Sequence, residues 1–70
     1  MNPDIINGET TATVIHADET SFKNFLSDFG YVWNRDNLTK VNGMFVLFVF
    51  PLLEMKHVKA AFDLWTESLE

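Results

Sequence analysis

Hydrophobic positions along the chain follow two spacings, one typical of strands and one typical of helices. Residues 10–16 alternate β-branched and small side chains, which predicts a strand. Residues 44–50 are apolar at all seven positions, as expected for a central strand. Residues 38–41 contain Thr39 and Lys40 and therefore suit an edge strand.

Two segments instead have the 3.6-residue period of amphipathic helices. The first begins after Asp18, a residue type suited to an N-cap, and ends at Gly30, which is suited to the position after a helix. The second runs to the end of the sequence, with Pro51 fitting its first turn. The apolar stripes of the two helices are Phe22, Phe25, Leu26 and Phe29, and Met55, Val58, Phe62, Trp65 and Leu69.

Two Asn-Gly pairs predict tight turns, because a type I′ turn needs positive φ at both central residues. Asn42-Gly43 separates residues 38–41 from 44–50 and predicts a hairpin. Asn7-Gly8 would join residues 4–6, as an additional N-terminal edge strand, to 10–16. Residues 31–34 either extend the first strand of the 38–50 hairpin or lead into it through a bend.

These elements predict one α+β domain over residues 1–70, with the order β-α-β-β-α and two layers. The sheet would have three strands, mainly antiparallel, and both helices would cover one face. A right-handed crossover from residues 10–16 would lead to a parallel neighbour, for which 44–50 is the natural choice. The expected strand order, 1-3-2, corresponds to one half of a ferredoxin-like sheet.

One layer of helices leaves part of the central strand without a cover, since side chains alternate between the two faces of a sheet. Met44, Val46, Phe48 and Phe50 would share one face. The other row would be Phe45, Leu47 and Val49. Unless sheet curvature or the N-terminal segment covers it, an apolar row facing water marks an interaction surface.

The second helix has a second apolar side, nearly opposite to its main stripe. Leu53, His57, Ala60 and Leu64 fall together at 100° per residue. They predict a helix contact across a twofold axis or against another protein. The alternative is that these are ordinary helix-forming and tolerated surface residues. Tyr31 and Trp33 are further candidate aromatic anchors for a partner.

Composition sharpens the expectation of a partner. The chain has 70 residues, no cysteine and an apolar share of 47%. A domain of this size buries only about 60% of its unfolded surface, and no disulfide can support it. The absence of cysteine fits a reducing compartment. The polar, base-free N-terminus does not resemble a targeting peptide, so we expect a cytoplasmic protein without a membrane span.

Candidate chemistry is sparse. His16 and His57 are the only side chains suited to act as bases at neutral pH, and no serine lies in a glycine-rich elbow. Glu54 and His57 have the i, i+3 spacing of di-metal bundles, but a metal site needs further carboxylates. We therefore expect no enzyme activity, cofactor or metal. If His57 lies in a contact, its titration would make association depend on pH.

The run Phe45-Val46-Leu47-Phe48, within the order β-α-β-β-α, resembles the third strand of an RNA recognition motif. Asn42-Gly43-Met44 replaces the basic-glycine opening of that signature, and the last strand of that fold is missing. The formal charge of -5 also opposes phosphate binding. RNA binding is accordingly the least favoured function.

The sequence predicts a protein–protein interaction module: a small acidic regulator or inhibitor, of the kind that phages and mobile elements carry, that occupies or organises a partner surface and forms dimers. The main alternative is mimicry of nucleic acid by exposed acids, for which we name Asp28, Asp36, Asp63 and Glu67. A structural subunit of a larger assembly is a third hypothesis.

Overall fold

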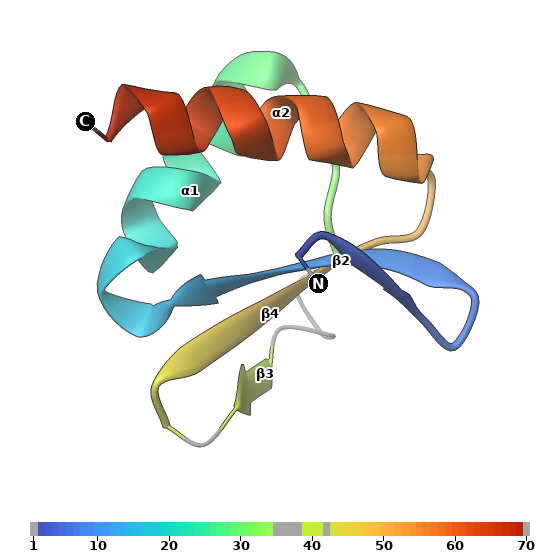
Figure 1. Cartoon of the computed structure of the whole chain (residues 1–70), viewed down its shortest axis with the longest axis horizontal. Helices are drawn as coiled ribbons and strands as arrows, with labels where there is room; N and C mark the ends of the chain where they lie inside the picture. The colour runs from blue at the N-terminus through green and yellow to red at the C-terminus, as the bar shows by residue number, and fades with distance from the viewer. Residues whose placement is uncertain (1, 35–38, 42, 70) are drawn as a thin grey trace.

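The computed structural model describes residues 2–34, 39–41 and 43–69 (Figure 1). Along the chain, each pair of strands is followed by a helix. The elements are β1 (Asp4–Ile6), β2 (Glu9–Ile15), the 3₁₀ turn η1 (His16–Asp18), α1 (Glu19–Phe29), β3 (Thr39–Val41), β4 (Phe45–Phe50) and α2 (Met55–Ser68). They make the predicted small α+β domain. None of the described helices combines the length and hydropathy needed to cross a bilayer.

The described strands form one sheet in the order β1-β2-β4-β3, and every neighbouring pair is antiparallel. The expected parallel pairing of residues 10–16 with 44–50 is therefore wrong, because Thr10 lies opposite Phe50 and Ile15 opposite Phe45. α1 instead connects β2 to β3, which run in the same direction, and β4 lies between them. The right-handed crossover rule concerns two parallel strands of one sheet, and here these strands are β2 and β3 rather than β2 and β4. The likeness to a ferredoxin-like half stays a prediction.

The predicted N-terminal hairpin is confirmed. Asn7 and Gly8 have φ values of 52° and 80°, and they connect Ile6 to its cross-strand partner Glu9. Both values lie in the left-handed region that a type I′ turn requires. Beyond β1, the side-chain amide of Asn2 continues the ladder, since it accepts a hydrogen bond from the Thr13 N–H (2.8 Å) and donates one to the Thr13 carbonyl. The N-terminal segment thus becomes an edge of the sheet.

Both helices lie on the same side of the sheet (Figure 1) and enclose the core with it. The ring of Phe22 is central, because its centroid lies 4.9 Å from those of both Phe48 and Trp65. Trp65 also donates a hydrogen bond from Nε1 to Oγ of Ser21 (3.1 Å), which joins the two helices. The buried core comprises Ala12, Val14, Phe22, Leu26, Val46, Phe48, Phe50, Val58 and Trp65.

Some element boundaries and one predicted cap differ from the sequence-based expectation. His16 begins η1 instead of ending the strand. Asp18 is the N-cap residue of α1 but makes no capping hydrogen bond through its side chain, whereas Gly30 ends α1 with φ 72° as predicted. Pro51 lies in the turn before α2, and the helix begins at Met55. Asn42, half of the second Asn-Gly pair, lies outside the described residues.

Candidate interaction surfaces

The outward row of β4 is covered unevenly from one end of the strand to the other. Val49 is buried, with 6% of its surface exposed, and Leu47 is half-buried. Phe45 is 37% exposed. The inward row of Val46, Phe48 and Phe50 is buried throughout. Within this row of β4, exposure is therefore concentrated at the end where the strand begins.

At this end, three exposed apolar residues come from neighbouring segments. Ile15, the last residue of β2, lies opposite Phe45 and is 54% exposed. Met44 precedes β4 and is 62% exposed. A hydrogen bond from the His16 N–H to the Met44 carbonyl (2.8 Å) holds the two chain segments together. We call Ile15, Met44 and Phe45 the sheet-end patch. Met44 does not join the buried row in which its position was predicted.

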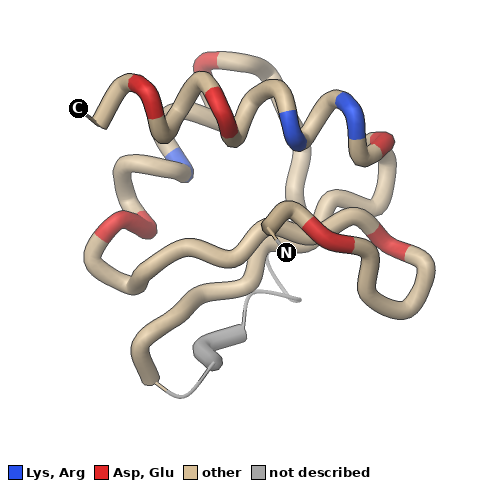
Figure 2. Tube along the Cα trace, viewed as in Figure 1, with Lys and Arg blue, Asp and Glu red and all other residues tan. Residues whose placement is uncertain are grey.

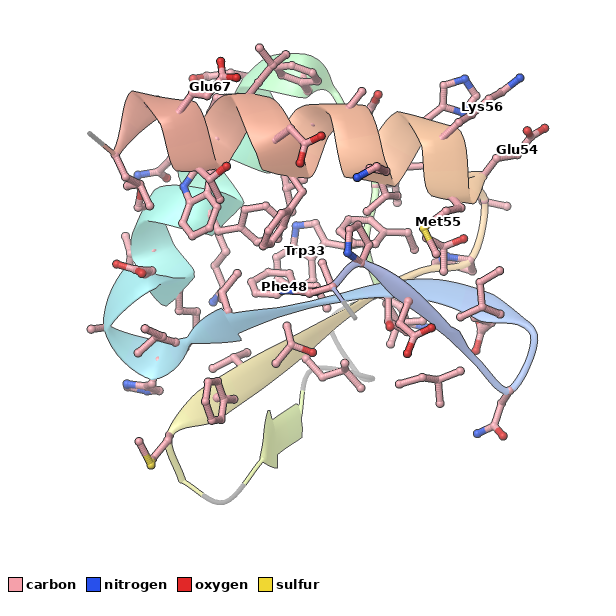
Figure 3. All side chains as sticks on the ribbon, in the orientation of Figure 1. Trp33, Phe48, Glu54, Met55, Lys56 and Glu67 are labelled. Carbon is pink, nitrogen blue, oxygen red and sulfur yellow. The ribbon has the colours of Figure 1, made fainter. Side chains whose placement is uncertain are left out.

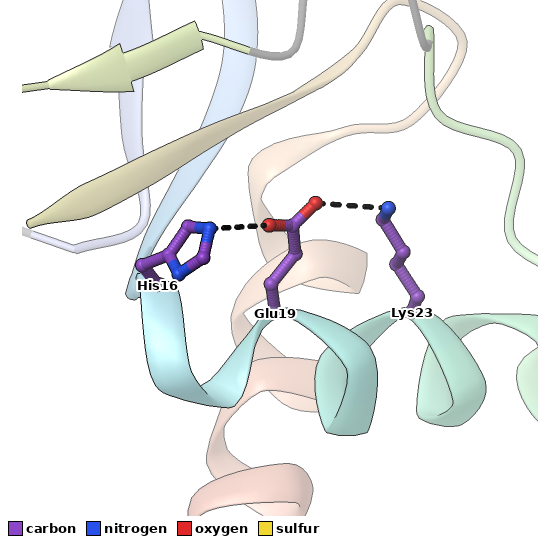
Figure 4. A network of polar contacts seen from close by, with 3 residues as sticks. All are labelled: His16, Glu19 and Lys23. Carbon is purple, nitrogen blue, oxygen red and sulfur yellow. Dashed lines mark ion pairs between the residues drawn. The ribbon is translucent and has the colours of Figure 1, made fainter. Parts of the chain in front are cut away.

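A network of polar contacts begins at His16, the residue after Ile15 of the sheet-end patch (Figure 4). Glu19 lies between two partners, with Oε1 3.6 Å from Nε2 of His16 and Oε2 2.8 Å from Nζ of Lys23. Lys23 also lies over the ring of Trp33, 5.5 Å from its centroid. His16 directly follows Ile15, so this network begins at the residue next to the patch in the chain.

A second exposed surface lies on α2. His57, Ala60 and Leu64 are all exposed, and Leu64 retains 49% of its surface. We call these three residues the helix patch. The hydroxyl of Tyr31 donates a hydrogen bond (3.5 Å) to the backbone carbonyl of His57, so the segment after α1 runs beside this side of α2.

The segment after α1 adds apolar area near the helix patch. Phe29 and Val32 are both exposed, and the ring of Phe29 meets that of Tyr31 edge to face with centroids 5.3 Å apart. Through Tyr31, these residues are connected to α2 at His57. The exposed apolar surface on this side therefore spans two chain segments.

Charged side chains are segregated along α2 (Figure 2). Lys56 and Lys59 belong to its first half, and Asp63 and Glu67 to its second. Figure 3 shows Lys56 and Glu67 pointing away from the sheet, whereas Met55 points toward it. Within the helix, Nζ of Lys59 lies 3.8 Å from a carboxylate oxygen of Asp63. Within α2 the bases therefore precede the acids, and the acidic N-cap residue Glu54, 3.6 Å from Nζ of Lys56, precedes both bases.

The nine predicted contact residues do not form one surface. Trp33 and Leu53 are half-buried and pack against the core, with the Trp33 ring 5.1 Å from that of Phe48 (Figure 3). Tyr31 is also half-buried and packs against the core. The remaining residues divide between the helix and the outer face of the sheet: His57, Ala60 and Leu64, and Phe45, Leu47 and Val49.

Sequence reasoning missed Ile15, Phe29 and Val32 as exposed apolar residues. Ile15 could have been found from an antiparallel β2–β4 register, which places it opposite Phe45. Phe29 was assigned to the apolar stripe of the first helix, but it is the last helical residue of α1, beside the Gly30 stop, and is exposed. The pattern around Val32 has no period from which its exposure could be read.

In the described part of the chain, no three His, Asp or Glu side chains are grouped so that they could hold a metal ion. Glu54, which shares the i, i+3 spacing of metal-binding helices with His57, has a carboxylate oxygen 3.6 Å from Nζ of Lys56.

Comparisons with protein-family models, with curated proteins and with solved structures find no match.

Proposed function

We propose that the chain is a non-enzymatic protein-interaction module that binds a partner protein through the sheet-end patch and acts by occupying or organising the partner's surface. The observation that supports this proposal is the pairing of Ile15 with Phe45 on the outer face of the sheet, both of them exposed to water.

The sheet-end patch has the physical properties of a contact centre. Strand pairing fixes two of its three members, Ile15 and Phe45, so little conformational entropy is lost when a partner covers them. Covering apolar surface contributes about 25 cal/mol per Å² before those costs. Phe45 is an aromatic side chain on a rigid strand, and aromatic anchors of this kind dominate binding energy in protein interfaces. The adjoining network of Glu19 would provide a polar edge.

The proposal is tested by capturing partners on immobilised protein and comparing two variants by quantitative mass spectrometry. Phe45→Asp places a charge in the sheet-end patch. Leu52→Asp is the matched control, because Leu52 is 81% exposed in the turn after β4. We expect a protein that is retained by the wild type and by Leu52→Asp and is lost with Phe45→Asp. Equal retention by both variants would contradict the proposal.

Nucleic-acid mimicry is the second candidate, supported by the exposed carboxylates of Asp28, Asp63 and Glu67; Asp36 lies outside the described residues. The purified complex separates the two functions by its salt dependence. Binding through an apolar patch should persist at about 0.5 M salt, whereas binding through exposed carboxylates should weaken steeply because salt screens them. A complex that dissociates at this salt concentration would favour mimicry.

A further inference from the structure

The outward side of α2 has a charge pattern that is complementary to itself. At 100° per residue, Lys56, Ala60, Asp63 and Glu67 lie within an arc of about 60°, opposite the buried Val58, Ala61 and Trp65. We call these four residues the outer stripe. Its two ends carry opposite charges, and its spacing, 4-3-4, is that of a helix–helix seam.

The same charges are arranged unfavourably within a single α2. Anions stabilise the N-terminal end of a helix and cations the C-terminal end. Within α2 the order is the reverse, with Lys56 in the first turn and Glu67 in the last; only the N-cap residue Glu54, 3.6 Å from Nζ of Lys56, has the favourable sign at its end of the helix. The Lys59–Asp63 pair also has the less favourable orientation, with the base preceding the acid. A second helix placed antiparallel would correct this mismatch.

We propose that α2 is a self-association surface, on which two copies of the chain pack their α2 helices antiparallel about a twofold axis. The axis would pass between Ala60 and Asp63, so that Lys56 of each copy faces Glu67 of the other. Lys56 and Glu67 are separated by eleven residues, or about 16 Å along the helix, and the two ion pairs would bracket the contact.

Antiparallel packing also brings the helix patch into the contact. In a twofold arrangement, identical flanks meet, so Leu64 of one copy would lie beside His57 of the other. Ala60, between them in sequence, is small enough to let the helices approach closely. A parallel arrangement would instead oppose like charges at both ends.

This inference goes beyond the proposed function, because it uses a different face and a different partner. Failure of the capture experiment with Phe45→Asp would leave it intact, and failure of self-association would leave the sheet-end proposal intact.

The test is the solution mass of the full chain, measured by sedimentation over about 0.01 to 1 mM at low salt. We expect the mass to rise from 8.1 kDa toward twice that value. Lys56→Glu alone, and Glu67→Lys alone, should each weaken association about tenfold, since two attractive pairs become repulsive. An equimolar mixture of the two variants should regain association, because every facing pair is then attractive.

Asn24→Glu and Asn24→Lys are the controls, since they change charge on the exposed side of α1 and should leave association unchanged. The Lys56 and Glu67 variants move charge in the direction that favours the helix, so circular dichroism should show them folded. Ala60→Glu is an independent variant that keeps helix propensity. In the proposed arrangement Ala60 of one copy faces Asp63 of the other, so the new carboxylate would face an existing one and should abolish association.

A wild-type chain that stays at the monomer mass over the whole range would overturn the proposal. So would charge reversals or Ala60→Glu that leave the mass unchanged, or a mixture of variants that remains monomeric. Association that is lost with Phe45→Asp but not with these variants would assign it to the sheet.

Discussion

β4 presents one row of side chains to the core and a second row to the opposite face of the sheet. The two rows differ in burial although both consist of apolar residues. Val46, Phe48 and Phe50 are buried in the core cluster together with side chains from both helices. Phe45, Leu47 and Val49 are equally apolar, yet their exposure rises toward the start of the strand. The two rows belong to the same six residues of chain, so hydrophobicity alone does not distinguish them.

The difference shows that the packing over an apolar side chain, rather than its residue type, decides whether that side chain contributes to stability or forms an exposed surface. The inward row meets Phe22 and Trp65 and contributes to stability. At its exposed end, the outward row meets water and contributes an apolar surface instead. The comparison can therefore be tested by substituting matched positions on the two faces and measuring stability and surface properties separately.

The largest expected effect is that of Phe48→Ala. Removing a fully buried phenyl ring leaves a cavity beside Phe22 and Trp33 and should cost about 3–5 kcal/mol of unfolding free energy. That loss approaches the whole stability of a small domain. Urea unfolding followed by tryptophan fluorescence measures it. Phe45→Ala, the same change on the outer face, should cost less than about 1 kcal/mol; equal losses would refute the distinction between the rows.

Much of the fold could be predicted from local patterns. Asn7-Gly8 specifies the first hairpin by the backbone that these residues tolerate, and Gly30 marks the end of α1. The direction of the β2–β4 pair could not be predicted in this way. A crossover rule constrains only the strand that receives the chain, which here is β3, and β4 reaches its place between them through the second hairpin.

A smaller loss of stability is expected for a substitution at Val49. It tests whether burial decreases along the outward row of β4 from Val49 to Phe45. Val49→Ala should cost about 2 kcal/mol, because this side chain is buried although it belongs to the outward row. Phe45→Ala removes more atoms and should nevertheless cost less. Urea unfolding of both variants under identical conditions gives the order. A greater loss for Phe45→Ala would mean that the start of β4 is covered in solution, for instance by a second copy.

The candidate surfaces were less predictable than the fold. Trp33 and Leu53 were predicted as contact residues, but both pack on the core. The burial of Trp33 depends on the path of residues 31–34, which a hydrogen bond from the Asn34 N–H to the Val49 carbonyl (3.0 Å) connects to the sheet. A segment of four residues is too short to show a periodicity from which this path could be predicted. Leu64 and Phe45 lie in regular elements, where helical spacing and strand alternation separate them from the main apolar rows, and both are exposed.

The smallest effect on stability is expected for Phe45→Thr combined with Ile15→Thr, which keeps two strand-forming residues at an exposed cross-strand pair. The free energy of unfolding should change by no more than about 1 kcal/mol. Binding of a fluorescent apolar dye to the native protein should nevertheless fall, because a dye needs contiguous apolar area.

Leu52→Thr is the control for this dye measurement. Leu52 is the more exposed residue, at 81%, but it stands in a turn and does not belong to the sheet-end patch. If exposure alone attracted the dye, Leu52→Thr would have the larger effect. If the cross-strand pair forms the patch, the Ile15 and Phe45 substitutions will dominate, since strand pairing holds their side chains next to each other.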